Sequence, residues 1–162
     1  MSDGAAGDVP AGAGGTDEAA GARWTGVHGE QEARARFGAA RVAHLATVTP
    51  EGAPHLVPVT FALDGGVIWW AVDAKPKRHR SLRRLDNIAA EPRVSLLVDH
   101  YEEDWERLWW VRVDGTASAA DGEEVGRGLE ALAARYAAYR VAAPEGPVVR
   151  VEVERWRWWS AR

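Results

Sequence analysis

A cluster of basic side chains is the strongest chemical signal in the chain. Six cations fall within ten positions with no acid among them: Lys75, Lys77, Arg78, Arg80, Arg83 and Arg84. Such a cluster repels itself, and a bound anion relieves the repulsion. At the start of a helix, backbone N–H groups and the helix dipole add to the attraction. The cluster therefore predicts a phosphate or polycarboxylate site, and a solvated helix face paired with the acids of 102–106 is the alternative.

A second signal is the run PHLVPVT at 54–60, in which two prolines interrupt a strand-like sequence. Proline gives no N–H to a sheet and is confined to edge strands. We expect Pro54 and Pro58 to leave backbone carbonyls unpaired along a strand that faces a planar ligand. An ordinary edge strand without a ligand would show the same pattern.

Tryptophan is the third signal, with nine copies beside two Phe and three Tyr. Two Trp-Trp steps, at 69–70 and 109–110, lie in strand-like runs, and neighbours in a strand point to opposite faces. Each step should place one indole inside the fold and one outside. The outward indoles predict a subunit interface or an aromatic wall for a ring.

Several kinds of catalytic machinery are missing from the sequence. It has no P-loop, no G-x-G-x-x-G opening a helix, no G-x-S-x-G elbow and no cysteine, and its five His are scattered. We therefore predict no metal site, and we expect any chemistry to come from a bound cofactor.

Four acids within residues 1–22 account for the net charge of −4, so the remainder is neutral and nucleic acid is not an expected partner.

The pattern of turns and apolar residues predicts a mainly β fold with helices. Expected strands cover 42–48, 55–63, 67–73, 93–99, 108–119 and 147–156; expected helices cover 28–40, the later part of 75–91, and a segment capped by Asp121. The turn Asp64-Gly65-Gly66 predicts a hairpin. Short turns join the first three strands into an antiparallel meander, and we expect the six strands to close into a small antiparallel barrel.

Two patterns add detail to this fold. The helix after Asp121 places Val125, Leu129, Leu132 and Tyr136 on one face, although Gly126 and Gly128 weaken its first half. In the last strand, Val149, Val151 and Val153 alternate with charged residues, which predicts one buried face.

Composition divides the chain into two parts. Residues 1–22 are mostly Gly and Ala and predict a disordered tail, and 23–162 form a single domain. No apolar run approaches the roughly 18 residues that a membrane span requires, and no secretory signal is evident. We expect a cytoplasmic protein.

Two segments carry a family resemblance: HLATVTPEGAPHLVPVTFALDG (44–65), and 71–117, with AVDAKPKRHRSLRRLDNIAAEPRVSLLVD at its start. They resemble the pyridoxamine-phosphate-oxidase-like superfamily of split β-barrels, the FMN-binding split-barrel type. Within it they are most similar to actinobacterial oxidoreductases that use the deazaflavin coenzyme F420. The resemblance implies a homodimer with two cofactors in clefts between the subunits.

The resemblance also implies which residues bind the cofactor. A basic residue eight positions before the strand-start proline corresponds to Arg84, with Arg83 beside it and Asn87 at a polar position of the same helix. Lys75, Lys77 and Arg80 would extend the charge toward the phosphate and glutamate tail of F420. The strand around His55, Val57, Pro58, Val59 and Thr60 would contact the ring system through its backbone.

One departure from the superfamily bears on the choice of cofactor. FMN-dependent members carry an Arg and a Lys on the second strand to hold the flavin phosphate. The matching positions here, Val57 and Ala62, are apolar. This favours F420, with FMN as the alternative, because charge-assisted hydrogen bonds are the strong ones.

The implied activity is hydride transfer between the deazaflavin and an electron-poor small organic substrate, without a covalent nucleophile. Thr60, His55 and Tyr101 are candidate proton donors, and no catalytic residue is assigned. Trp70, Trp109 and Trp110 are candidates to wall the substrate or the partner subunit. An FMN-dependent oxidase or reductase, a non-enzymatic F420 carrier and a dimeric scaffold without a ligand remain as alternatives.

Overall fold

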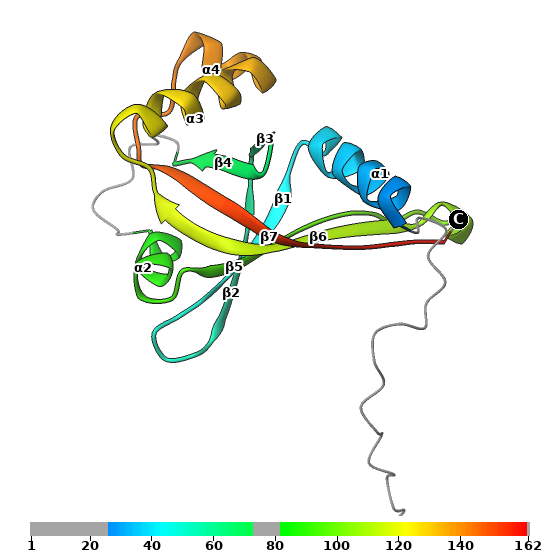
Figure 1. The fold of residues 1–162 in the computed structure, drawn as a ribbon. Coiled ribbons are helices and arrows are strands. Elements are labelled where there is room, and N and C mark those ends of the chain that lie inside the picture. Colours follow the sequence, from blue (N-terminus) through cyan, green and yellow to red (C-terminus); the bar gives the residue numbers. More distant parts are fainter. Residues whose placement is uncertain (1–25, 73–81, 162) are drawn as a thin grey trace, which may run out of the picture.

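The computed structural model describes residues 26–72 and 82–161 of the chain. Four α-helices, one 3-10 helix and seven strands appear in these ranges (Figure 1). Their bounds are α1 Gly26–Ala39, β1 Ala43–Val48, β2 Pro54–Val59, β3 Ala62–Asp64, β4 Val67–Ala71, α2 Arg83–Ala90, β5 Arg93–His100, η1 Trp105–Arg107, β6 Trp109–Ala119, α3 Gly122–Arg135, α4 Ala137–Val141 and β7 Val148–Ser160. The expected tail at 1–22 lies outside the described residues.

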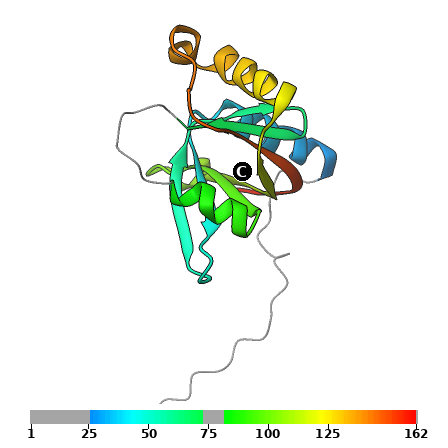
Figure 2. The same cartoon turned by 90° about the vertical axis from the view of Figure 1, so that its left-hand side faces the viewer.

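The strands form one antiparallel sheet in the order β2-β1-β5-β6-β7-β4-β3. Alternate residues of each central strand point to a common inner face, where Leu45, Leu96, Val111 and Val151 are wholly buried. The sheet curls around this core, giving a split half-barrel (Figures 1 and 2). The mainly β, antiparallel architecture predicted from the sequence is confirmed.

The expected strand at 55–63 is divided in two, which makes the described strands seven instead of six. It breaks at Thr60 and Phe61, and its halves β2 and β3 lie at opposite ends of the strand order. The predicted three-strand meander is therefore wrong, since β2 and β4 are not neighbours. Three residues span at most about 11 Å, so Val59 and Ala62 bring the two edges of the curled sheet together at this corner.

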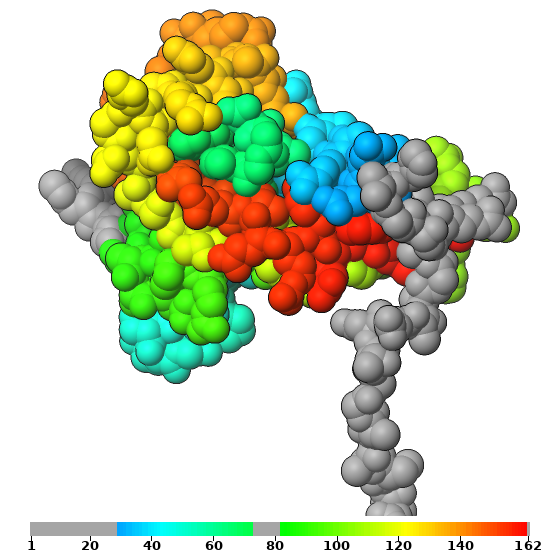
Figure 3. All heavy atoms as spheres, viewed as in Figure 1, coloured from blue at the N-terminus to red at the C-terminus, as the bar shows by residue number. Residues whose placement is uncertain are grey.

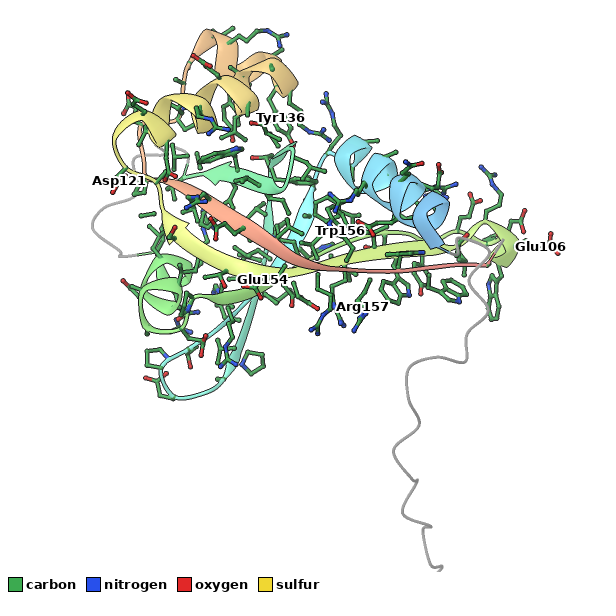
Figure 4. All side chains as sticks on the ribbon, viewed as in Figure 1. Glu106, Asp121, Tyr136, Glu154, Trp156 and Arg157 are labelled. Carbon is green, nitrogen blue, oxygen red and sulfur yellow. The ribbon has the colours of Figure 1, made fainter. Side chains whose placement is uncertain are left out.

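Two tyrosines hold the corner between β2 and β3. The Phe61 N–H donates to the Tyr136 hydroxyl at 3.1 Å, and this hydroxyl lies 2.9 Å from the Phe61 carbonyl and 2.8 Å from the Arg41 carbonyl, with one proton to donate. The Thr60 and Tyr139 hydroxyls lie 2.9 Å apart. Figure 4 shows Tyr136 reaching from the helices toward β3. The Tyr136 bonds satisfy backbone groups of Phe61 that the broken strand would otherwise leave unpaired, and the Tyr139 bond holds the Thr60 side chain.

Helix α3 packs on β4 through a glycine that the sequence suggested was a weakness. A Cβ at Gly128 would lie 2.7 Å from the Trp69 ring and 2.6 Å from a Val148 methyl. The missing side chain therefore lets the helix approach the strand. Leu132 is wholly buried on the same helix face, as predicted. Asp121 is at the cap position, but its side chain makes no capping hydrogen bond.

Helix α1 covers the other half of the inner core and lies against β7 (Figure 3). Phe37 packs against Phe61, with ring centroids 4.9 Å apart, and meets Trp156 edge-on at 5.4 Å. Trp156 is an even-numbered residue, whereas the β7 valines buried in the inner core, Val149 and Val151, are odd-numbered. A bulge explains the change, because Asp114 pairs with Arg155 while Gly115 pairs with Val153. Figure 4 shows Trp156 directed toward α1 and Arg157 directed away.

None of the helices in the described ranges is long and apolar enough to cross a membrane.

Candidate functional site

The outer edge of β2 is open. Among the described strands, β2 pairs with β1 alone. The Thr49 N–H donates to the Ala53 carbonyl at 2.8 Å, and hydrogen-bonded pairs alternate along an antiparallel ladder. The backbone groups of His55, Val57 and Val59 are thereby directed to β1. Positions 54, 56 and 58 direct theirs to the free edge.

This free edge is rich in acceptors and poor in donors. Pro54 and Pro58 have no N–H, so the edge presents three carbonyls and the single N–H of Leu56 between Pro54 and Pro58. Such an edge resists addition of another strand, yet it can bind a ring that carries both donors and acceptors. The predicted unpaired carbonyls are therefore present.

The start of α2 supplies positive charge close to this hairpin. Leu82 occupies the cap position and its side chain makes no capping hydrogen bond, while Arg83, Arg84 and the acid Asp86 lie in the first turn. A hydrogen bond from Thr49 lowers the pKa of Glu51, and the charge of Arg83 lowers it further, which places Arg83 near the β1–β2 turn. Figure 2 shows α2 beside this hairpin. A first turn without a side-chain cap, in which two arginines outnumber one acid, suits an anion.

Arg84 also contacts the core. Its guanidinium lies over the Trp70 ring, 5.3 Å from the centroid. Trp70 is fully buried, and its indole N–H has no hydrogen-bond partner within the described ranges. Trp70 therefore holds Arg84 through a cation–π contact and does not line an open pocket.

A buried polar chain links α2 to both strands of the hairpin. The Asn87 amide donates to the Thr47 hydroxyl at 2.8 Å, and that hydroxyl lies 3.3 Å from the His55 Nδ1. Asn87 is 1% exposed and Thr47 2% exposed. Thr47 was missed by the sequence reasoning, although its inward position on β1 followed from strand alternation.

The remaining predicted binding residues are divided among different environments. Val57 and Val59 face the inner side, Pro58 is exposed on the other side, and Thr60 is engaged with Tyr139 at the corner. Lys75, Lys77 and Arg80, together with Arg78, lie outside the described residues. The structure thus brings His55, Asn87 and Arg83–Arg84 to one region and holds Thr60 against Tyr139 at the corner between β2 and β3.

The acids of 102–106 do not pair with α2. Glu102 contacts Arg107 at 2.9 Å and His100 at 3.6 Å. Figure 4 shows Glu106 at the end of the molecule opposite α2. The proposed neutralisation of the α2 arginines by this loop is therefore wrong.

The outer face of β1, β5 and β6 carries a shallow hollow of about 580 Å³. Its apolar lining includes Leu56, Leu97, Tyr101 and Trp110, with His44 4.0 Å from Asp99 at the rim. A second hollow of about 400 Å³ shares Ala46 and Ser95 with it. Leu56 and Tyr101 are 64% and 65% exposed, so this sheet face is an apolar surface without a cover among the described residues.

The Trp-Trp steps follow the predicted alternation. Trp69 lies under α3 and Trp70 inside the half-barrel. Trp109 packs against the inner core and Trp110 lines the outer hollow. Of the three suggested wall residues, Trp110 is thus on an open surface, while Trp70 is not.

No group of three or more metal-ligating side chains occurs in the part of the chain that the structure describes. The curled antiparallel sheet agrees with the comparison against known families. The family described as Pyridoxamine 5'-phosphate oxidase matches residues 30–160. The chain belongs to this family.

Solved structures show the same split-barrel fold as this pyridoxamine 5'-phosphate oxidase family member. A conserved hypothetical protein, Rv2991, from Mycobacterium tuberculosis is 26% identical over 82% of this chain and 85% of its own, with a TM-score of 0.67. A heme binding protein from Mycobacterium smegmatis is 28% identical over 78% and 52%, with a TM-score of 0.65. An FAD-binding protein from Mesorhizobium loti, 20% identical over 79% and 91%, has a TM-score of 0.60. A comparison with curated proteins gives no match.

The family suggests a flavin-type cofactor, and the residues fit such a group in part. The free edge of β2 suits a ring, and the first turn of α2 suits a phosphate. The two positions at which FMN-dependent members carry cations are apolar. Ala62 is 4% exposed on β3, on a different strand from Val57. The described residues therefore offer one phosphate-binding element, at α2.

Proposed function

We propose that this family member is an F420-dependent oxidoreductase that transfers a hydride between the deazaflavin and an electron-poor small organic substrate. The observation that carries the proposal is the open edge of β2 beside the uncapped, doubly basic first turn of α2. The carbonyls and the one N–H of that edge suit a planar ring that has both donors and acceptors. A cytoplasmic setting is part of the proposal.

Each element would have a separate task at this site. Arg83 and the first-turn N–H groups of α2 would bind the phosphate, and Lys75, Lys77 and Arg80 would extend the charge along the anionic tail. The backbone at Leu56 and Pro58 would orient the ring. When bound, the deazaflavin supplies the hydride chemistry, so the chain needs no covalent nucleophile.

The proposal includes a homodimer that forms through the outer sheet face. Exposed Leu56 and Tyr101 and the hollow between β1 and β6 supply the apolar centre that a stable interface requires. Arg112 lines this hollow and lies 3.1 Å from Asp114, which lines the neighbouring hollow. A second copy on this face would enclose the cofactor edge, because Leu56 belongs both to β2 and to the hollow.

The apolar Val57 and the buried Ala62 are the reason to prefer F420 over FMN. An FMN phosphate would lack the strand-borne cations that other members use. The long anionic tail of F420 instead matches the cations of the 75–84 segment. FMN binding is the alternative outcome of the experiment below.

The test is a titration of the purified protein with F420 and with FMN, followed by tryptophan fluorescence. We expect saturable binding of F420, tighter than FMN, and about tenfold weaker after Arg83→Ala, since a charged hydrogen bond contributes roughly 1.5–3 kcal/mol. Arg127→Ala on α3 is the matched control, an exposed arginine on the other side of the fold. Tighter FMN binding would reverse the choice of cofactor.

Turnover separates an enzyme from a carrier. The reduced F420 complex should be oxidised by at least one electron-poor acceptor, such as a quinone or a nitroaromatic compound. Tight F420 binding without turnover across a panel of such acceptors would identify a carrier instead.

A further inference from the structure

We infer that Asn87 and Thr47 are positioning residues that hold His55 as a hydrogen-bond donor toward the bound ring. The identity of the ligand rests on the proposed function, whereas the hydrogen bonds among the three side chains are observed in the protein itself. The three residues come from α2, β1 and β2, so the helix and both strands of the hairpin meet in one polar chain.

The direction of the hydrogen bonds follows from the donors. The Asn87 side-chain amide donates to the Thr47 oxygen at 2.8 Å. Thr47 then still has its own hydroxyl proton to donate, and it is 2% exposed, so water is not a ready acceptor. The His55 Nδ1, 3.3 Å away, is the acceptor beside it.

This arrangement selects one tautomer of the imidazole. If Nδ1 accepts from Thr47, the proton of the neutral ring lies on Nε2. His55 then has a single donor left. Thr47 and His55 face each other in register across β1 and β2, so the strand pairing fixes the side from which Nδ1 is approached.

The burial of the Asn87–Thr47–His55 hydrogen bonds argues against a purely structural role for these side chains. Asn87 is only 1% exposed and Thr47 2% exposed, and polar side chains buried this deeply are costly unless their hydrogen bonds are satisfied. Apolar side chains of the same shape would fill these positions at no such cost. Its terminus at His55, half-buried on the open edge strand, is where a fixed donor can reach a ligand.

The first experiment reads the tautomer directly in the ligand-free protein. Long-range proton–nitrogen correlation spectra of the neutral ring should show Nδ1 unprotonated and Nε2 protonated. In Thr47→Val the two tautomers should mix, and in Thr47→Ser the wild-type pattern should return. A mixed or Nδ1-protonated ring in the wild type would overturn the inference.

The second experiment measures F420 and FMN binding by the same variants. Thr47→Val and His55→Phe should raise the Kd about fivefold to tenfold, the effect of one lost hydrogen bond, while Thr47→Ser stays within about twofold. Thr116→Val is the control, since it removes a threonine hydroxyl, bonded to Glu154, from another strand. Circular dichroism confirms that each variant is folded.

The two experiments separate the possible failures. A fixed tautomer with unchanged affinity in folded His55→Phe would show that the donor does not serve the cofactor, and would overturn the inference while the proposed function stands. If the wild type binds neither cofactor, the proposed function fails and the ligand-directed role of His55 fails with it. The tautomer spectra decide the role of Thr47 in either case.

Discussion

The two edges of the sheet differ in how their backbone groups are hydrogen-bonded and how closely other elements pack on them. At β3, Tyr136 bonds the corner backbone, Tyr139 bonds the Thr60 hydroxyl, and α3 packs so closely on β4 that Gly128 has no room for a side chain. At β2, two prolines leave the edge open, and exposed Leu56 borders an uncovered sheet face. The β3 side maintains the fold, although a hollow of about 600 Å³ lies between β3 and α3, and the proline-containing β2 edge is available for binding.

The strongest test of the β3 side is Gly128→Ala. Both contacts of the new Cβ are under 3 Å, so we expect a loss of about 3 kcal/mol in the free energy of unfolding, at the upper end for overpacking. Urea unfolding measures it. Gly126→Ala is the matched control on the same helix, where a Cβ meets nothing within 4 Å, and it should stabilise by about 0.5–1 kcal/mol. Equal effects of the two changes would contradict the close approach of α3.

Tyr136→Phe removes the hydroxyl that binds the strand corner. The Phe61 N–H and the two carbonyls would lose a partner, so the free energy of unfolding should fall by about 1–2 kcal/mol. Thermal unfolding by circular dichroism measures the change. Tyr101→Phe, on the open side, should leave the transition temperature unaltered; a similar fall there would remove the distinction between the two edges.

Leu56→Glu tests the open face. Because Leu56 is 64% exposed in the single chain, the variant should fold normally, but a charge at the centre of the proposed interface should make the protein monomeric in analytical ultracentrifugation. Val141→Glu, 90% exposed on α4, should leave assembly unchanged. A wild type that sediments as a monomer would contradict the proposed dimer.

The smallest effect concerns Glu91, on the open side. Hydrogen bonds from Arg93 lower the pKa of Glu91 to about 2. A lowered folded-state pKa means that the contribution to stability is present above the ordinary carboxyl pKa and is lost as the pH falls through about 2. Wild type and Glu91→Gln should therefore differ by a small constant amount at neutral pH and converge in acid. Divergence in acid would contradict the ion pair.

Much of the fold was predictable because the signals were local. Alternating apolar residues predicted β1, β5 and β6, and Asp64-Gly65-Gly66 predicted the β3–β4 hairpin, in which Gly65 has a φ of +60°. The break at Thr60 was not predictable in this way. The hydroxyls that stabilise it come from Tyr136 and Tyr139, some 75 residues along the chain.

The candidate site was predictable to a different extent. Pro54 and Pro58 correctly indicated an edge strand, because proline lacks an N–H. The link of Asn87 to Thr47 was not visible, since it depends on how α2 lies on β1. Trp70 is a candidate from the sequence to wall the substrate or the partner subunit, whereas in the structure it is fully buried, with Arg84 of α2 over its ring.

The most direct measurement of the central claim is the backbone amide spectrum of the labelled protein during titration with F420. We expect the Leu56 N–H, which lies between the two edge prolines, to shift and saturate together with the amides of Arg83 and Arg84. Shifts confined to amides of β3 and α3, with Leu56 unmoved at saturation, would show that the open edge of β2 is not the binding site.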